Sequence, residues 1–170
     1  MMDFYSTIIF VVKFSDLDDI DLRLLDALQD DASPSNQSLA ERFNISPPTC
    51  LRRLRRLREA GWIESQVVIL SADRIGPLLT AVVEVSLDRQ DASALDAFEQ
   101  RVAPDDAVQQ CYRVSPGPDF VLVVTVRDMP AYQALAQRLF TNDANVRNVK
   151  AFFSIKRAKF APRVPLPSLA

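Results

Sequence analysis

The segment from Ser38 to Ile63, SLAERFNISPPTCLRRLRRLREAGWI, constrains the fold more than any other part of the chain. Its pattern predicts two helices joined by a tight turn. Asn44 stands where the first helix must end in a left-handed residue, a conformation that Asn tolerates. Ser46 is a good N-cap for the second helix, Pro47 suits its first position, and Gly61 suits its C-terminal end. The segment therefore has the form of a helix-turn-helix.

The second of these helices separates apolar from basic side chains. Its buried side is expected to carry Leu51, Leu54 and Leu57. Its other side carries residues at i, i+3, i+4 and i+7, namely Thr49, Arg52, Arg53 and Arg56. Only Glu59 is an acidic neighbour in the sequence, so this face is predicted to stay positive and to suit the DNA major groove. The structural alternative is a solvated amphipathic helix without a nucleic-acid partner.

Composition limits the functions that remain open. The chain has 170 residues and a formal net charge of -2, so a basic surface for nucleic acid must be local. Histidine is absent, which excludes Ser–His–Asp, Cys–His and HExxH chemistry. Two cysteines, Cys50 and Cys111, are too few and too far apart for a metal site or a disulfide framework, which favours a reduced, cytoplasmic setting. We expect neither a cofactor nor a metal.

Local signals also divide the chain into parts. Asp18 and Asp21 have the spacing of a capping box at the start of a first helix, and Ser35 is a suitable cap for the next. Gly76-Pro77 marks a hinge. We expect an N-terminal extension at residues 1–15, a helix-turn-helix DNA-binding domain at 16–64, a linker strand and hinge at 65–78, an effector-binding and oligomerisation domain at 79–160, and a tail at 161–170.

Beyond the hinge the sequence predicts the element order β-α-β-β-α-β of a ferredoxin-like domain. The apolar residues Ala81, Val83, Val85 and Leu87 alternate with more polar ones, as in a strand with one buried face. Residues 120–126 are apolar on both faces, so this strand should be central or lie in a subunit interface. The expected strands are 80–87, 108–115, 120–126 and 146–155, and the expected helices are 92–102 and 130–140. One face of such a sheet is uncovered, and pairing with a second copy would bury it.

Three segments resemble the Lrp/AsnC (leucine-responsive regulator/asparagine regulator) family of bacterial and archaeal transcription factors. LDDIDLRLLDALQDDA looks like the family's opening helix, NISPPTCLRRLRRLREAGWI is similar to its recognition-helix segment, and CYRVSPGPDFVLVV matches the start of its effector-domain hairpin. The resemblance covers nearly everything from Leu17 to about Lys159. It implies an α+β fold, with an N-terminal winged helix-turn-helix followed by a C-terminal ferredoxin-like βαββαβ domain that dimerises and often assembles into octamers.

The resemblance also implies roles for individual residues. By position, the DNA-facing segment contains Ser46, Thr49, Arg52, Arg53 and Arg56. Arg52 and Arg53 are the first choices, because an arginine that bridges guanine O6 and N7 supplies about 1–3 kcal/mol of discrimination. Arg55 and Arg58 are expected to touch phosphates or only solvent. Amino acids or related small metabolites are implied to bind between dimers, and the effector-binding residues are expected to be Ser115, Gly117, Asp119 and Ala151.

The effector region departs from the family pattern. Pro116 stands where the family has a glycine, which follows here as Gly117, and Val149 and Ala151 replace the threonines of many relatives. Losing hydroxyl donors while keeping Asp119 should weaken the capture of an amino acid's carboxylate. We therefore hypothesise an altered effector or an unresponsive regulator, which micromolar binding of an ordinary amino acid would contradict. The alternative role for Asp119 is a turn residue that satisfies backbone N–H groups.

Two other functions are weighed against a regulator. An architectural protein that wraps DNA through phosphate contacts would differ mainly in its low sequence specificity. Siroheme decarboxylases have a similar two-domain layout, but their chemistry is associated with histidine in the ligand cavity, which this chain lacks. We therefore predict a sequence-specific DNA-binding transcriptional regulator, not an enzyme, that binds promoter DNA as dimers or higher oligomers and responds to an amino acid or related metabolite.

Overall fold

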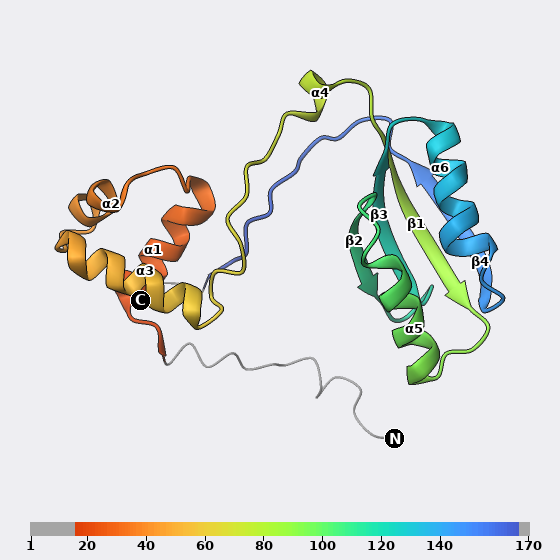
Figure 1. Ribbon diagram of the computed structural model, residues 1–170, viewed down its shortest axis with the longest axis horizontal. Helices are drawn as coiled ribbons and strands as arrows, with labels where there is room; N and C mark the ends of the chain where they lie inside the picture. Colours follow the sequence, from red (N-terminus) through yellow and green to blue (C-terminus); the bar gives the residue numbers. More distant parts are fainter. Residues whose placement is uncertain (1–15, 167–170) are drawn as a thin grey trace. The chain divides into compact units, whose positions relative to one another are not determined.

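The computed structural model describes residues 16–166, so the expected extension at residues 1–15 lies outside the described residues. The chain divides into two compact units (Figure 1). One unit runs up to Val68 and resumes at Phe160, and the other is Ile69–Lys159. Among the described residues, no helix is both long and apolar enough to cross a membrane.

Three helices build the first unit: α1 (Asp19–Asp30), α2 (Asn36–Arg42) and α3 (Pro47–Glu59). Their starts are the predicted ones. Asp18 and Asp21 form a capping box in which each carboxylate accepts the other residue's backbone N–H, at 3.0 and 3.1 Å. Ser35 caps α2 and Ser46 caps α3 with their side-chain oxygens. At each helix start, the side chain of the N-cap residue thus accepts a hydrogen bond from one of the backbone N–H groups that have no partner within the helix.

The turn and the end of α3 also follow the sequence signals. Asn44 has a positive φ of 54°, which reverses the chain after α2. Gly61, with a φ of 77°, directly follows the C-cap of α3. The Gly61 N–H donates to the Arg58 carbonyl at 3.0 Å and the Trp62 N–H donates to the Leu57 carbonyl at 2.9 Å, a Schellman motif. The helix-turn-helix is therefore fixed at both ends of α3.

The three helices enclose a small apolar core. Its buried members are Leu24, Ala27, Leu39, Ala40, Phe43, Cys50 and Leu54. Burial raises the pKa of the Cys50 thiol, so this cysteine behaves as a packing residue. The prediction that Leu51 is buried was wrong, because its side chain is 47% exposed. At about 100° per residue, Cys50, Leu54 and Leu57 fall within about 60° of one another, whereas Leu51 lies about 120° from Leu57, at the edge of the apolar face. Cys50 takes the place that Leu51 was expected to fill.

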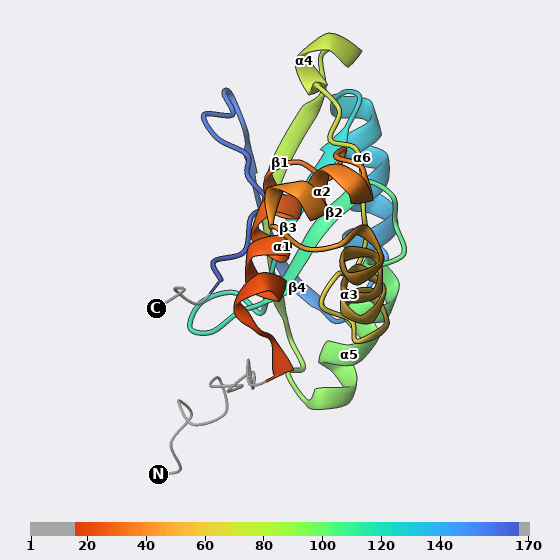
Figure 2. The same ribbon diagram turned by 90° about the vertical axis from the view of Figure 1, so that its left-hand side faces the viewer.

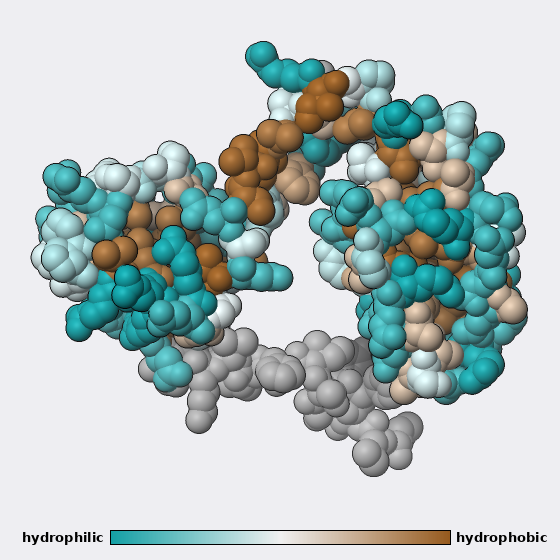
Figure 3. Space-filling model, in the orientation of Figure 1, coloured by the Kyte–Doolittle hydropathy of each residue, from teal (hydrophilic) through white to brown (hydrophobic). Residues whose placement is uncertain are grey.

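The segment after α3 has no strand partner within the described part of the chain. Residues 63–71 have no regular secondary structure, and a short helix, α4 (Ala72–Ile75), precedes the glycine of the predicted hinge. Val67, Val68, Ile69 and Leu70 are all more than half exposed. Figure 3 shows apolar atoms gathered along this segment. An exposed run of apolar, mostly β-branched residues is typical of a surface that another chain covers.

The second unit has the predicted ferredoxin-like arrangement. Its strands are β1 (Leu79–Leu87), β2 (Val108–Arg113), β3 (Phe120–Val126) and β4 (Val146–Phe153), and its helices are α5 (Ala92–Val102), α6 (Met129–Ala136) and η2 (Gln137–Thr141), a π-helical continuation of α6. The strands form one antiparallel sheet in the order β2-β3-β1-β4. β3 is central, as its apolar faces predicted. Figure 2, which shows the sheet from the side, places α5 and α6 on the same face.

That face of the sheet holds the core of the second unit. Ala81, Val83, Val85 and Leu87 of β1 are all at most 1% exposed and pack with Phe98 and other helix residues. The opposite face is open. Val82, Tyr112 and Phe152 are 39%, 53% and 54% exposed there, on three different strands. Single exposed apolar residues are common on protein surfaces, whereas a continuous row of them across several strands is typical of an interaction site. This face of the sheet is therefore a candidate interface.

The chain returns to the first unit through its C-terminal tail. The Arg163 guanidinium forms ion pairs with Asp26, at 2.5 Å, and with Asp30, both on α1. The Val164 N–H donates to the side-chain oxygen of Gln29 at 2.6 Å. These contacts attach the tail to α1. The start of the same helix also contacts α3.

Candidate nucleic-acid interface

One face of α3 is basic and open to solvent. Arg52, Arg55 and Arg58 are exposed, and within residues 16–166 none of them forms an ion pair. Figure 3 shows hydrophilic side chains over this helix. The opposite face of α3 is anchored in the core by Leu54 and Leu57, so the arginines stand on a fixed support. A capped helix with a buried face and a free basic face has the form of a major-groove reader.

Arg53 and Arg56 are held differently. Arg53 Nη1 lies 2.6 Å from Asp18 Oδ2 and 2.9 Å from Asp21 Oδ1, and its side chain is only 20% exposed. Arg56 pairs with the other oxygen of Asp21. The expectation that Arg53 faces outward was therefore wrong, and Glu59, the only acidic neighbour in the sequence, is not the acidic partner of either arginine. The acidic partners come from the start of α1, more than thirty residues earlier in the chain.

Asp21, which the sequence indicates only as a capping residue, also holds both arginines. Its side chain is fully buried, and its two oxygens serve Arg53, Arg56 and the backbone N–H of Asp18. Partial burial alone would raise the pKa of Asp18, but hydrogen bonds from the Asp21 N–H and the Arg53 guanidinium outweigh it and hold this pKa below its ordinary value. The same pairing, first with Asp18 and then with Asp21, raises the pKa of Arg53. Asp18 and Arg53 therefore both stay charged at neutral pH.

The first turn of α3 carries the remaining predicted contacts. The Ser46 and Thr49 hydroxyls share a hydrogen bond of 2.8 Å, and the Ser46 oxygen also caps the Thr49 N–H. Asn36 of α2 donates to the Pro47 carbonyl at 2.9 Å and so ties the two helices together. Ser46 and Thr49 thus shape the end of α3 that would lie deepest in a groove, with Ser46 exposed and Thr49 half-buried.

The predicted effector residues fall into two groups. Ser115 and Gly117 are exposed in the loop before β3, which contains a cis Ser115–Pro116 peptide. Asp119 ends this loop and is used by the fold, because its Oδ2 accepts the Leu87 N–H at 2.7 Å and the Gln90 side chain at 3.3 Å. The Asp119 carboxylate therefore satisfies a backbone N–H, as its interpretation as a turn residue requires.

Ala151 lies apart from that loop. It pairs with Val83 in the β1–β4 ladder and packs against the helix-covered core, whereas the loop is exposed. The structure therefore does not bring Ala151 together with Ser115 and Gly117 on one open surface. Period-two alternation along β4 sets this orientation, and the family resemblance alone could not assign the face.

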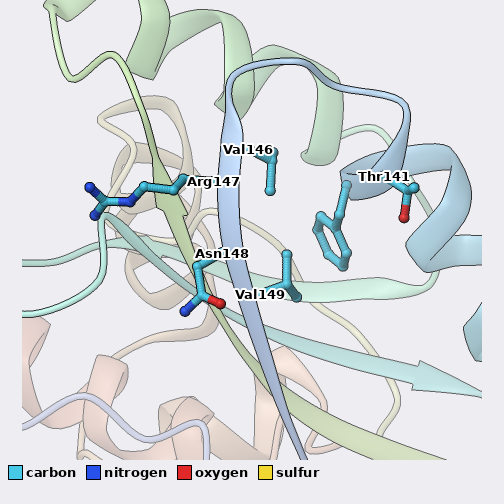
Figure 4. Close-up of a pocket in the computed structure, with 6 residues that line it drawn as sticks. Thr141, Val146, Arg147, Asn148 and Val149 are labelled. Carbon is cyan, nitrogen blue, oxygen red and sulfur yellow. The ribbon is translucent and has the colours of Figure 1, made fainter.

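A pocket of about 240 Å³ lies where η2 meets the edge strand β4. Its lining residues are Phe140, Thr141, Val146, Arg147, Asn148 and Val149. Figure 4 shows the side chains of Val146 and Val149 on one side of the strand and those of Arg147 and Asn148 on the other. Val149 is one of the two positions at which the family resemblance implies a threonine. The pocket therefore has an apolar side chain where that resemblance leads us to expect a hydroxyl.

Comparison with known proteins agrees with this two-part arrangement. Residues 17–64 match the winged helix-turn-helix DNA-binding domain, and residues 80–164 match the Lrp/AsnC ligand binding domain. The chain is 36% identical to the leucine-responsive regulatory protein of Rhizobium meliloti over 89% of this chain and 97% of that protein. It is 34% identical to the Bkd operon transcriptional regulator of Pseudomonas aeruginosa over 89% of this chain and 99% of that protein.

Solved structures with similar sequences have the same fold. An AsnC family transcriptional regulator from Agrobacterium tumefaciens superposes with a TM-score of 0.80 at 27% identity, over 88% of this chain and 97% of that one. The L-Met complex of a transcriptional regulator from Neisseria meningitidis gives a TM-score of 0.79 at 28% identity, over 88% and 96%. Both domain matches and the full-length relatives lead to one assignment. The chain belongs to the Lrp/AsnC family of transcriptional regulators.

Proposed function

We propose that this regulator binds specific DNA sites by placing α3 in the major groove, with Arg52 as the base-reading residue. The observation that carries the proposal is the set of free arginines, Arg52, Arg55 and Arg58, on the exposed face of a helix whose other face is core. Arg52 lies nearest the N-terminal end of α3, the part of a recognition helix that reaches base edges. Arg55 and Arg58 supply phosphate contacts. Arg53 and Arg56 support α3 rather than read bases.

Selection from a randomised duplex library, with the full-length protein, tests this function even though the target sequence is unidentified. We expect enrichment of a pseudo-palindrome with half-sites about 10–10.5 base pairs apart, because a symmetric dimer presents its recognition helices to successive major grooves. An architectural protein would retain DNA without enriching a motif, and that result would refute site-specific binding. Failure to retain any DNA would reopen the enzyme alternative.

The dimer is proposed to form through the open sheet face. Val82, Tyr112 and Phe152 provide the apolar side chains, and a second copy presents the same residues in a self-complementary contact. Replacing Val82 with Glu puts a charge at the centre of this contact. Sedimentation velocity should then detect a smaller species than for the wild-type protein. An unchanged sedimentation coefficient would contradict the proposed interface. Assembly of dimers into an octamer is the further step that the same experiment resolves.

A small-molecule effector is proposed to act on this assembly, as the L-Met complex of the Neisseria relative suggests. Asp119 is already engaged by the Leu87 N–H, and the pocket at β4 has Val149 in place of a hydroxyl donor. Both features support an effector other than an ordinary amino acid, or no response at all. Titration calorimetry with the common amino acids should give no micromolar binding, and micromolar binding of any of them would contradict this. A cytoplasmic location is part of the same proposal, because the target is promoter DNA.

A further inference from the structure

The start of α1 reduces the charge that α3 can present to DNA. We propose that Asp18 and Asp21 are positioning residues that set the general affinity for DNA: they withhold Arg53 and Arg56 from DNA phosphates, so that binding depends on Arg52 and its free neighbours. This inference rests on the proposed DNA binding and goes beyond it, because it assigns a role in recognition to two carboxylates that do not touch DNA.

The geometry of the two carboxylates is that of a clamp. The Arg53 Nη1 atom is held between Asp18 Oδ2, at 2.6 Å, and Asp21 Oδ1, at 2.9 Å. The second oxygen of Asp21 takes Arg56 and the Asp18 N–H. Because Asp21 is fully buried, it cannot exchange these partners for water. A charge buried in this way strongly resists the loss of its partners.

The effect on charge is large for a helix of this size. The five arginines of α3 and its single Glu59 amount to a charge of +4. Asp18 and Asp21 reduce this to +2, and the reduction falls on Arg53 and Arg56. Each arginine that neutralises a phosphate contributes about 0.9 to the slope of log affinity against log salt concentration, here called the salt slope. Two arginines withheld per protomer should therefore lower the salt slope measurably.

Withholding phosphate contacts lowers the affinity for all DNA. Phosphate contacts raise the affinity for every sequence alike, whereas base contacts raise it only for the correct one. Many non-specific sites compete for a regulator, and a high general affinity holds the protein on them. A recognition helix with all five arginines free would bind any duplex more tightly without discriminating better. Asp18 and Asp21 therefore keep the general affinity low and leave the base-reading contacts unchanged.

The test measures fluorescence anisotropy of the full-length protein on the selected duplex and on a shuffled duplex over a salt series. Asp21→Asn frees Arg56 and loosens Arg53 while keeping an oxygen for the Asp18 N–H. Asp18→Asn removes the other carboxylate and keeps the helix cap, because Asn caps as well as Asp. Asp19→Asn is the matched control, since Asp19 is exposed, lies in the same turn, and has no ion pair among residues 16–166.

We expect both test variants to bind the shuffled duplex more tightly than wild type. Each arginine freed should steepen the salt slope by about 0.9, equivalent to about an eightfold gain at 0.1 M salt relative to 1 M, so one arginine freed in each protomer of a bound dimer should steepen it by about 1.8. The ratio of selected to shuffled affinity should stay near the wild-type value, because both affinities rise together, and Asp19→Asn should match wild type in both slope and ratio. Adding Arg53→Met to Asp18→Asn should restore the wild-type salt slope, because the freed arginine is removed again. If Asp18 acted only as a structural residue, the second substitution would not restore the slope.

Other outcomes overturn the inference. Test variants whose salt slopes equal that of Asp19→Asn would show that the two carboxylates do not limit phosphate contacts. If the Asp21→Asn variant unfolds, as Trp62 fluorescence would reveal, the salt slope of Asp18→Asn alone tests the inference. This variant should fold, because the Asp18 carboxylate is exposed and Asn is an equivalent N-cap. Failure of the proposed function looks different: wild-type protein would then not prefer the selected duplex, whatever the variants do.

Discussion

Arg53 and Arg52 are adjacent in the sequence, yet the structure predicts opposite consequences for their removal. Arg53 bridges Asp18 and the fully buried Asp21, whereas Arg52 is exposed and makes no ion pair within residues 16–166. Removing one partner of a buried ion pair costs about 3–5 kcal/mol when the remaining charge is left alone. Asp21 keeps Arg56 and a backbone N–H, so we expect about 1.5–3 kcal/mol, the range for a hydrogen bond to a charged group. Truncating Arg52 should cost within about 0.5 kcal/mol.

Urea unfolding followed by tryptophan fluorescence measures this difference directly. Trp62 is the chain's single tryptophan and belongs to the first unit, so its signal reports the helices around Asp21. Arg53→Met keeps the aliphatic stem and removes the charge, and it should lower the urea midpoint without a change in m value. Arg52→Met is the matched control. Equal midpoints for the two variants would refute the assignment of Arg53 as a supporting residue.

Three further predictions concern single positions. Leu54→Ala should cost about 2–5 kcal/mol because the side chain is 5% exposed, whereas Leu51→Ala, at 47% exposure, should cost under about 1 kcal/mol, both by urea unfolding. Asp119→Ala should lower stability by about 1–3 kcal/mol, measured by circular dichroism, because it leaves a backbone N–H without its acceptor; no loss would contradict the structural role. Hydrogen bonds from Ser93 and from the start of α5 lower the pKa of Asp91 from 3.8 to about 2. The stability it adds above pH 3.8 is thus lost as the pH falls towards 2, and Asp91→Asn should flatten the pH dependence of the melting temperature in that window.

Local signals predicted the elements because each depends on neighbours in the sequence. The capping box of Asp18 and Asp21, the left-handed Asn44 and the glycine after α3 act over three or four residues. Strand alternation likewise identified Val83 and its buried companions, since period two alone assigns the faces of a strand. These features therefore do not depend on tertiary contacts.

The site could be predicted only in part because its electrostatics are tertiary. Helical periodicity places Arg52 and Arg53 at neighbouring angles, about 100° apart, and cannot tell which one meets another helix. That difference is decided by Asp18 and Asp21, which the sequence identifies as caps. The face on which Ala151 lies is also tertiary: the resemblance gave its position on the last strand, but the pairing with Val83 decides its face.

Reading of a specific DNA sequence by the free arginines of α3 can be measured as a ratio of affinities. The two affinities are those for the selected and the shuffled duplex, compared between wild type and Arg52→Ala/Arg55→Ala. We expect a ratio well above tenfold for wild type, given that specific binding usually exceeds non-specific binding by about a thousandfold or more. In the double variant we expect a loss of about 1–3 kcal/mol of that discrimination from Arg52. An unchanged ratio in the double variant would contradict the assignment of α3 as the reading helix.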